Sequence, residues 1–332
     1  NYIGDEPVRT IYFGGGTPSV IEIELLNEIL QTIRLNYTID PDCEITLECN
    51  PDDLEEEKLI ALHKFGVNRL SIGIQSFNNN VLEFMNRAHN STQATNSVIM
   101  AKACGFDNIT IDLIYGVPGT TMETWKNQLD LMLELGVPHL SAYCLTIEEN
   151  TVFGNWQKKG KLKPYEDQES LKQFQYLIDF MEKNGYEQYE ISNFARPSFI
   201  SKHNSAYWLG EKYLGVGPSA HSFNGAKRSW NVANNPKYIQ LIKKEEAFNE
   251  EETLSLKDQF NEYILTRLRT KWGIALADLT EISAEMLADS MPVLMDNIAE
   301  GNLVKNGDVY TLTNQGKYIA DGISADLFSD VP

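Results

Sequence analysis

Short apolar runs alternate with helical patterns through the first half of the chain, and this alternation constrains its fold most. The runs predicted as strands are 9–13, 43–49, 68–75, 108–115 and 139–147. Between and after them, the apolar spacing predicts helices at 21–34, 53–65, 80–85, 93–104 and 122–135. Strands that alternate with helices at this spacing form a parallel sheet covered by helices. Both an open doubly wound sheet and a barrel fit the pattern.

The second half changes character after a long helix predicted at 168–184. Glycine and aromatic residues then dominate short segments, which predicts an irregular sheet. From residue 250 onward we predict a small helical domain, with a hairpin across Asn306-Gly307, a strong type I′ turn signal. The predicted parts are an α/β domain over 1–185, a sheet extension over 186–248 and a winged-helix-like helical domain over 249–332. An acidic chain favours a packing role for the winged helix over nucleic-acid binding.

Composition narrows the class of protein. The 332 residues include 28 basic and 47 acidic side chains, a net charge of −19. This charge repels phosphate backbones, so no nucleic-acid partner is predicted. No transmembrane segment and no secretory signal are evident, and we predict a cytoplasmic protein. The chain lacks an initiator methionine and enters its first strand at once, which suggests a missing upstream part; a natural start after processing is the alternative.

The four cysteines do not resemble a disulfide scaffold or a metal site. None of them forms a C-x-x-C pair, and Cys43 and Cys49 flank one predicted strand. Six strand residues span about 20 Å, so these two thiols cannot ligate one metal cluster. We interpret all four, Cys104 and Cys144 included, as buried reduced thiols.

Side-chain alternation along the strands predicts a site. Strands 43–49, 68–75 and 108–115 each have one apolar face and one small or polar face. If the apolar faces pack on helices, the other faces point into a lumen, and Glu48, Gln75 and Asp112 lie near the carboxyl ends of their strands. Barrel folds place ligand contacts there. Three separate loop-anchoring residues are the alternative interpretation.

A triple-glycine turn, Gly14-Gly15-Gly16-Thr17-Pro18, follows the first strand and precedes a helix. Glycines let a backbone approach a ligand closely and expose amide groups to it. The turn is neither G-x-G-x-x-G nor a P-loop with its lysine, so a dinucleotide or a triphosphate is not indicated. A tight turn without a ligand remains the alternative.

Several ordered motifs together resemble the radical S-adenosylmethionine (SAM) family of oxygen-independent coproporphyrinogen III oxidases. They are Y-F-G-G-G-T-P at 12–18, E-C-N-P at 48–51, R-L-S-I-G-I-Q-S-F at 69–77, N-R at 86–87, I-D-L-I-Y-G-V-P-G at 111–119, E-I-S-N-F-A at 190–195, H-N-S-A-Y-W at 203–208, G-V-G-P-S-A-H-S at 215–222 and L-T-N-Q-G at 312–316. The resemblance covers nearly the whole chain. It implies that residues 1–185 form a partial (β/α) barrel of radical SAM type without its first βα unit.

By motif match, the resemblance also implies the SAM contacts. These are Gly15, Gly16, Thr17, Glu48, Gln75, Arg87, Asp112 and, on the predicted fifth strand, Thr146. Carboxylates and glycine amides suit an ammonium group and ribose hydroxyls, and an arginine suits a carboxylate. Family members carry C-x-x-x-C-x-x-C after their first strand for a 4Fe-4S cluster. This chain has no such motif, so we expect neither the cluster nor reductive SAM cleavage from it alone, and the cluster only in a full-length form.

Two subfamilies share these motifs, the oxidases and the heme chaperones known as HemW. The histidine and aromatic signature at 203–221 resembles the chaperones, which implies heme as a cofactor and client hemoproteins as partners. His203 and Tyr207 are candidate heme-iron ligands, and His221 is a third, less firmly based candidate. His203 capping a turn is the alternative.

Porphyrin biosynthesis by an oxidase and a non-catalytic porphyrin-binding scaffold remain alternative functions. The remaining histidines, His63, His89 and His139, receive no function.

Overall fold

The computed structural model describes residues 2–149, 151–160, 162 and 167–331. Two compact units make up the chain, Pro7–Ile200 and Ser201–Pro332 with Asn1–Glu6. The finer division predicted at residues 185 and 248 stays a prediction.

The first unit contains a seven-stranded sheet in the order β1-β2-β3-β4-β5-β7-β6. Its strands are β1 (Val8–Phe13), β2 (Ile39–Cys49), β3 (Arg69–Gln75), β4 (Ile109–Tyr115), β5 (His139–Cys144), β6 (Glu187–Glu190) and β7 (Asn193–Ala195). Its helices are α1 (Ile23–Asn36), α2 (Glu56–Phe65), α3 (Asn79–Phe84), α4 (Ser91–Ala103), α5 (Met122–Glu134), α6 (Val152–Lys158) and α7 (Asp167–Lys183). Short 3₁₀ turns occur at Pro18–Val20, Pro51–Asp53 and Pro197–Phe199.

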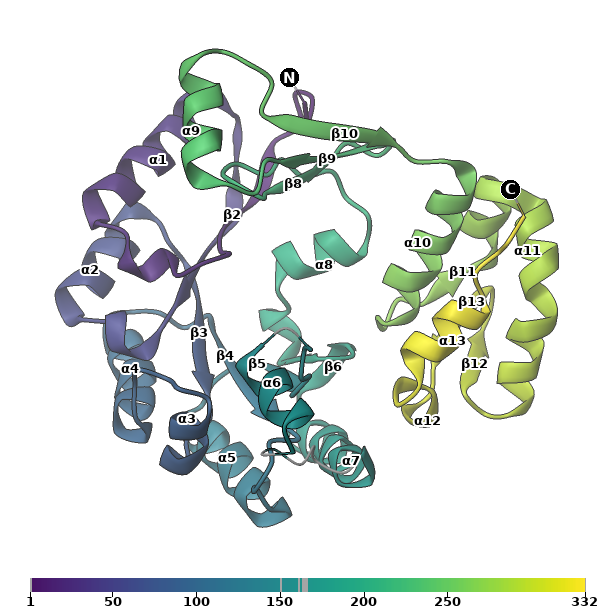
Figure 1. The fold of residues 1–332 in the computed structure, drawn as a ribbon, viewed down its shortest axis with the longest axis horizontal. Coiled ribbons are helices and arrows are strands. Elements are labelled where there is room, and N and C mark those ends of the chain that lie inside the picture. The colour runs from purple at the N-terminus through teal and green to yellow at the C-terminus, as the bar shows by residue number, and fades with distance from the viewer. Residues whose placement is uncertain (1, 150, 161, 163–166, 332) are drawn as a thin grey trace. The chain divides into compact units, whose positions relative to one another are not determined.

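The strand order decides between the two folds that the alternation allowed. Strands β1 to β5 are parallel, and each pairs with its neighbours in the sequence. A doubly wound sheet would reverse its strand order partway across. The sheet instead curls in one direction with α1, α2, α4, α5 and α7 outside it (Figure 1), so the partial (β/α) barrel is confirmed. Strands β7 and β6 extend it with antiparallel pairing.

The apolar faces of the strands form the core between sheet and helices, as predicted. Leu47, Leu70, Ile72 and Ile111 are fully buried. The helices supply equally buried side chains, such as Leu59 of α2. Each fully buried Leu or Ile contributes roughly 1.5–3 kcal/mol. This core fixes which face of each strand is left for the lumen.

Helix ends in the first unit follow local sequence signals. Helix α2 stops at Gly66, whose φ of +97° is a left-handed conformation, and whose amide donates back to His63 and Leu62 carbonyls. Helix α4 starts with a capping box, in which Asn90 and Gln93 bond each other's backbone amides. For both helices, the predicted and observed boundaries agree within three residues.

The second unit begins with helix α8 (Lys202–Trp208) and a small antiparallel sheet in the order β10-β9-β8. Its strands are β8 (His221–Phe223), β9 (Lys227–Asn231) and β10 (Asn249–Thr253), and helix α9 (Asn235–Lys243) lies between β9 and β10 in the sequence. Strand β10 thus occupies the first residues of the predicted helical domain, whose boundary stays a prediction. The acidic run 249–253 pairs with β9 along its full length, and Lys227 neutralises Glu251 there at 2.7 Å.

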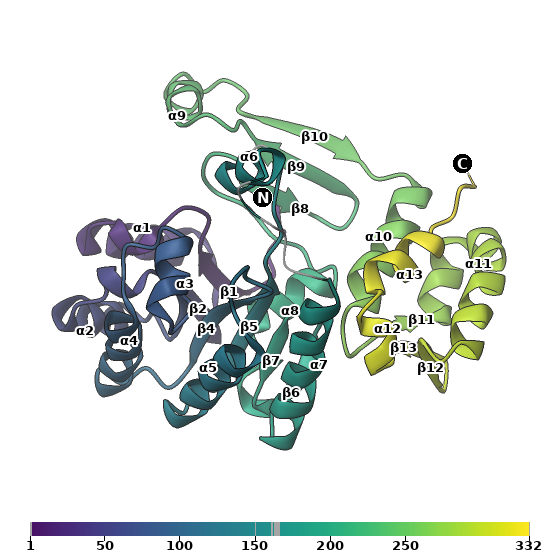
Figure 2. The same cartoon turned by 60° about the horizontal axis from the view of Figure 1, so that its bottom comes forward.

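The rest of the second unit is the predicted helical domain with its hairpin. Its helices are α10 (Leu256–Leu268), α11 (Leu276–Ala299), α12 (Asn314–Lys317) and α13 (Ala320–Asp326). Its strands β11 (Ile274–Ala275), β12 (Leu303–Asn306) and β13 (Val309–Leu312) form a sheet in the order β11-β13-β12 (Figure 2). Strands β12 and β13 join across Gly307, with φ +64°, as the Asn-Gly signal predicts. Helices with a small hairpin sheet confirm the winged-helix-like prediction.

A search of the described helices for a segment long and apolar enough to cross a membrane finds none.

Candidate functional site

The lumen face of the curled sheet carries a row of polar side chains. Tyr12 of β1 donates a hydrogen bond from Oη to Glu48 Oε1 of β2 at 2.5 Å. Burial and then the Glu48 charge raise the pKa of Tyr12, and Asp112 on β4 adds a smaller effect. The charge of Glu48 in turn raises the pKa of Asp112. Two carboxylates from β2 and β4 therefore share one environment, as the alternation predicted.

The triple-glycine turn closes around Glu48. The amide of Gly15 donates to Glu48 Oε2 at 3.1 Å, so this amide already has a partner, whereas the sequence predicted it free for a ligand. A Cβ on Gly14 would lie 2.4 Å from Tyr12 Cε1 and 2.9 Å from Glu48 Oε1. Position 14, which the motif match did not select, therefore has no room for a side chain beside Tyr12 and Glu48. A Cβ on Gly16 would meet open space.

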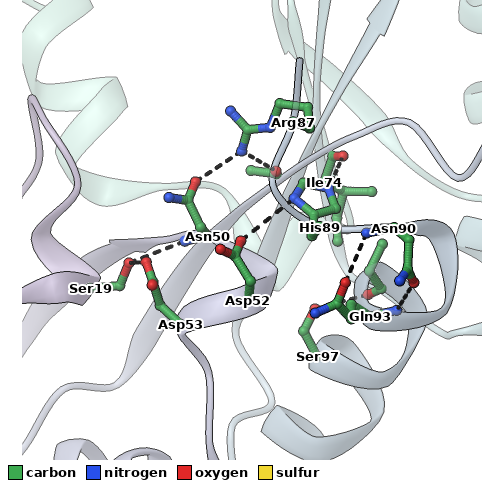
Figure 3. Close-up of polar contacts among 12 residues, drawn as sticks. Ser19, Asn50, Asp52, Asp53, Ile74, Arg87, His89, Asn90, Gln93 and Ser97 are labelled. Carbon is green, nitrogen blue, oxygen red and sulfur yellow. Dashed lines mark hydrogen bonds and ion pairs between the residues drawn. The ribbon is translucent and has the colours of Figure 1, made fainter. Parts of the chain in front are cut away.

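Thr17 ends the turn and leads into the Pro18–Val20 turn without a side-chain cap bond. Ser19, two residues further on, fixes the end of the E-C-N-P segment (Figure 3). Ser19 Oγ donates to Asp53 Oδ2 at 2.6 Å and accepts the Asn50 amide at 3.2 Å. The glycine turn and the end of β2 are therefore tied together.

Arg87 bridges the ends of β2 and β3 (Figure 3). Its Nη2 donates to Asn50 Oδ1 at 2.9 Å and to the Gly73 carbonyl at 3.1 Å. Its Nε is buried with no hydrogen-bond partner among the described residues. Asn86, directly before Arg87, adopts a left-handed backbone conformation with φ +53°. A guanidinium with an unused donor can donate a further hydrogen bond to an anionic or carbonyl group of a ligand.

Gln75 ends β3 in a left-handed conformation, φ +62°, which is uncommon for a residue other than glycine and marks local strain. Its Nε2 lies 3.0 Å from the place where a Gly73 Cβ would stand, and Arg87 Nη2 lies 3.6 Å from it. Gln75 and Arg87 therefore flank Gly73 at one mouth.

His89 supports this mouth rather than lining it. It is buried, and its Nε2 bonds the Ile74 carbonyl at 2.9 Å, directly before Gln75. Burial lowers the pKa of His89, and its Nδ1 lies 3.8 Å from Asp52 Oδ1 (Figure 3). A neutral ring that donates to the Ile74 carbonyl gives this histidine a positioning role that the sequence did not reveal.

Asp112 is the most perturbed carboxyl of the site. Burial, with a smaller contribution from the Glu48 charge, raises its pKa to about 7, against the opposing effects of Ser141, Arg69 and Arg87. A carboxyl with this pKa is partly protonated at neutral pH. Perturbed carboxyls cluster at functional sites, although ion-pair networks also produce them.

The sequence missed four lumen residues that the same alternation could have found. Ser141 and Tyr143 lie on the polar face of β5, and burial raises the pKa of Tyr143. Arg69, buried at the start of β3, bonds Asn108 and Thr110. Tyr12 occupies the matching position on β1. On β1, on β5 and at the first residue of β3, the same alternation places these side chains on the lumen face.

The sequence predicted Thr146 on the fifth strand, and this prediction is wrong. Strand β5 ends at Cys144, and Thr146 is exposed two residues beyond it. The chain leaves the sheet after the Leu145 amide bonds the Tyr115 carbonyl. Thr146 therefore lies outside the strand register that places Glu48, Gln75 and Asp112.

The candidate heme ligands lie in the second unit. His203 and Tyr207 are four residues apart on α8, so both project from the same side of the helix. Tyr207 is 49% exposed, and its ring contacts those of Trp208 and Tyr213.

His221 lies on a different element, β8, and is also exposed. Ring contacts run from Tyr207 to Tyr213 and on to Phe223, two residues beyond His221. The three candidates thus belong to one aromatic region. The structure records no geometry that makes them a single ligand set.

Trp208 and Trp230 are partly buried, as expected of packing residues. Trp208 stacks under the Arg269 guanidinium at 4.5 Å, and Trp230 lies 6.4 Å from the His221 ring.

Comparison with known proteins identifies relatives. The Radical SAM superfamily model matches residues 1–132. The chain is 41% identical to "Heme chaperone HemW" of Lactococcus lactis over 81% of this chain and 71% of that protein. It is 35% identical to the protein of the same name from Bacillus subtilis over 96% of this chain and 85% of that protein.

One solved structure has the same fold over almost the whole chain. It is the coproporphyrinogen III oxidase HemN from Escherichia coli, described as a radical SAM enzyme, with a TM-score of 0.82 and 24% identity. The match covers 98% of this chain and 78% of that one. At this identity it supports the curled sheet and the helical domain, and leaves the reaction open.

Proposed function

The chain belongs to the HemW family of radical SAM proteins, and from this premise we propose that it binds SAM at the mouth of its curled sheet and carries heme for client hemoproteins. The observation that carries the SAM part is the convergence of Glu48, Asp112 and Arg87 on one face, with a buried Arg87 Nε that has no hydrogen-bond partner in the part of the chain that the structure describes.

The residues of the mouth fit SAM chemically. SAM carries an ammonium, a sulfonium, a carboxylate and two ribose hydroxyls. Glu48 and Asp112 can meet the cationic groups and the hydroxyls, and Arg87 can meet the carboxylate. The remaining proposed contacts come from the glycine turn, Gly15, Gly16 and Thr17, from Gln75, and with the weakest support from Thr146.

The residues of the chain do not fit a 4Fe-4S cluster. Cys43 and Cys49 are buried as predicted, whereas the prediction of burial is wrong for Cys104, which is half-buried, and for Cys144, which is exposed. Burial raises the pKa of the Cys49 thiol, which opposes the thiolate form that iron needs. Within the described ranges, no group of three or more His, Cys, Asp or Glu side chains could hold a metal ion. We therefore propose the cluster only for the full-length protein and derive no step through it.

The heme proposal is supported by α8 and β8. Imidazole and phenolate are both known heme-iron ligands, and His203 and Tyr207 share one side of a helix with Tyr207 exposed. His221 is a further candidate on the adjacent sheet. Cytoplasmic location, client hemoproteins and heme itself are proposals that follow from the family.

SAM affinity tests the first part. Glu48→Gln and Asp112→Asn should each weaken SAM binding by roughly 10- to 100-fold, because a hydrogen bond to a charged group contributes about 1.5–3 kcal/mol. Glu57→Gln, which changes an exposed carboxylate on α2, is the matched control and should bind as the parent does. Parent-like affinity in both site variants would contradict the SAM pocket.

Hemin titration tests the second part. His203→Ala should lower the Soret absorbance of the complex or shift its position, whereas His63→Ala, which removes an exposed histidine of α2, should leave the spectrum unchanged. An unchanged spectrum in His203→Ala removes this ligand. Turnover of coproporphyrinogen III by the reconstituted full-length protein would instead support the alternative, an oxidase.

A further inference from the structure

Helix α10 of the helical domain holds the end of α8, the helix that carries two candidate heme ligands. Arg267 Nη2 of α10 donates to the Leu209 carbonyl at 3.1 Å, and Leu209 is the C-cap of α8. A helix leaves its last carbonyls without a partner inside the helix, and a cation there also suits the negative end of the helix dipole. Arg267 therefore fixes the end of α8 directly.

Arg269, the C-cap of α10, contacts the last side chain of α8. Its guanidinium lies 4.5 Å from the centre of the Trp208 ring, a cation–π contact. Trp208 Nε1 is buried and has no hydrogen-bond partner in the described part of the chain, so its ring contacts, rather than a hydrogen bond, orient this side chain. The Tyr207 ring meets it edge-on at 5.3 Å. The position of Tyr207, a candidate ligand, therefore depends on Arg269 through Trp208.

The same helix is also bonded to the sheet that contains β8. Arg228 of β9 donates from both Nη atoms to the two carboxylate oxygens of Glu262 on α10, at 2.7 and 2.8 Å. A two-pronged pair of this kind fixes direction as well as distance. Glu262 precedes Arg269 by two turns of helix, so one face of α10 contacts β9 and α8 at points roughly 10 Å apart along its axis.

The sheet leads this contact back to α8. Arg228 is the register partner of Phe223 on β8, and the backbones of Phe223 and Tyr213 bond each other twice, at 2.9 Å. The rings of Tyr213 and Tyr207 lie 5.7 Å apart. The contacts thus close into a ring, from α10 through α8, the aromatic region and β9 back to α10. In such a ring, no element can shift without loosening a contact on one of its sides.

Helix α10 is itself anchored in the helical domain. The Tyr263 ring lies 5.3 Å from the Arg267 guanidinium. The Tyr263 hydroxyl donates to Asp278 Oδ2 at 2.6 Å and accepts the Ala275 amide at 3.1 Å, which ties α10 to the start of α11. The core face of α10 consists of the fully buried Phe260, Ile264 and Leu268. The arginines of α10 are therefore presented from a fixed framework.

We propose that Glu262, Arg267 and Arg269 are positioning residues of the heme site. Through them the helical domain fixes the candidate ligands of α8 relative to β8. The inference rests on the proposed function in one respect, that heme iron is bound at α8. The helical domain, for which the sequence favoured a packing role, thereby takes part in ligand binding.

Exchange of the ion pair tests the β9 side, with the whole chain as the protein and hemin as the probe. Glu262→Arg places two guanidinium groups side by side and separates α10 from β9, so hemin affinity should fall by roughly tenfold. Adding Arg228→Glu reverses the pair and should restore the parent affinity. Lys257→Met removes a cation of α10 that pairs with the exposed Asp330, and this control should bind hemin as the parent does.

Two single variants test the α8 side. Arg267→Met removes the bond to the Leu209 carbonyl, and Arg269→Met removes the cation from the Trp208 ring. Each should lower hemin affinity by roughly two- to fivefold, because one contact of this kind is lost. Arg269→Lys keeps a cation over the ring and should retain most of the parent affinity.

A spectroscopic signature separates positioning from a loss of stability. A variant that is only less stable contains fewer folded molecules, and each of these gives the parent spectrum. In Glu262→Arg and Arg269→Met, the Soret position and the electron paramagnetic resonance spectrum of ferric heme should instead change at saturating hemin. The exchanged pair and Arg269→Lys should return both spectra to those of the parent.

Parent-like affinity and spectra in Glu262→Arg and Arg269→Met overturn the inference. Weak binding in Glu262→Arg that the exchanged pair does not restore overturns it as well. The proposed function fails separately, if His203→Ala and Tyr207→Phe both leave the hemin spectrum unchanged, and the inference then fails with it. If these two variants change the spectrum and the α10 variants do not, the heme site stands and the inference fails.

Discussion

The mouth of the curled sheet and the aromatic region on α8 and β8 are built in different ways. At the mouth, neighbouring parallel strands place Tyr12, Glu48 and Asp112 by register, and these side chains already bond or influence one another. On α8, a seven-residue helix, His203 and Tyr207 stand on a partly exposed surface.

This difference bears on how each region would meet a ligand. At the mouth, Tyr12, Glu48 and Arg87 are joined to neighbouring segments by hydrogen bonds, so their positions are set before a ligand arrives. Among the described residues, the buried atoms there without a hydrogen-bond partner are Arg87 Nε, Thr46 Oγ1 and His89 Nδ1. The aromatic region is held by ring contacts instead, from Tyr207 to Trp208 and Tyr213, and Tyr207 is 49% exposed. We expect changes at the mouth to act through displaced neighbours, and changes on α8 to act only through the ligand itself.

The largest effect is expected for Gly14→Val at the mouth. The added side chain occupies space held by Tyr12 and Glu48, which must separate. SAM affinity should fall by roughly 100-fold, because about two charge-assisted contacts are displaced together. Calorimetric titration with SAM measures this loss of affinity.

The matched control for this variant is Gly322→Ala, since a Cβ there meets nothing within 4 Å. It should bind SAM as the parent does. Parent-like affinity in Gly14→Val would show that the turn does not shape the mouth.

The next effect is the pH dependence of stability caused by Asp112. Its pKa rises from 3.8 to about 7 on folding, so its contribution to stability is fully present below about pH 4 and is lost as pH rises through 7. Between about pH 5 and pH 7 the free energy of unfolding should fall by roughly 2 kcal/mol relative to Asp112→Asn, near 1.4 kcal/mol per pH unit at most.

Urea unfolding of the parent and of Asp112→Asn at several pH values measures this difference. A difference that is constant with pH, or one that grows as pH rises, is incompatible with a carboxyl held neutral by the fold.

A smaller effect is expected for Tyr207→Phe on α8. The variant loses the phenol oxygen and keeps the ring contacts with Trp208 and Tyr213. If the phenolate binds heme iron, hemin affinity should fall by about tenfold, roughly 1.4 kcal/mol, without loss of stability. Tyr37→Phe, outside this region, is the control for hemin absorbance. A loss of folding stability in Tyr207→Phe would show instead that the α8 surface depends on its own framework.

The smallest effect concerns the helix that follows the mouth. Asn90→Ala removes the side-chain oxygen that accepts the Gln93 amide in the α4 capping box, and should cost about 1 kcal/mol in the free energy of unfolding. Asn96→Ala, on an exposed turn of the same helix, should change it by less than about 0.5 kcal/mol. Equal values for the two variants would show that the cap does not stabilise this unit.

Much of the first unit could be predicted from sequence, because apolar periodicity reports burial directly. The five parallel strands and the inward faces of Glu48 and Asp112 follow from alternation and from a helix layer on one side. The alternation could equally have revealed Tyr12, Ser141 and Tyr143, which lie on the same faces.

Other features depend on contacts between distant segments, which periodicity does not encode. The bond from Asn193 to Glu190, and its link to Ser141 fifty-two residues earlier in the chain, appear only when β7 pairs with β5. No strand is predicted for the acidic run 249–253, because it lacks the apolar alternation of a half-buried strand. Its strand form comes from pairing with β9.

The most direct test of the account is a crystal structure of the chain grown with SAM. The account predicts SAM density at the carboxyl ends of β2 to β4, with Glu48 and Asp112 on its cationic and hydroxyl groups and Arg87 on its carboxylate. SAM density elsewhere on the chain, with Glu48 still bonded only to Tyr12 and Gly15, would contradict it.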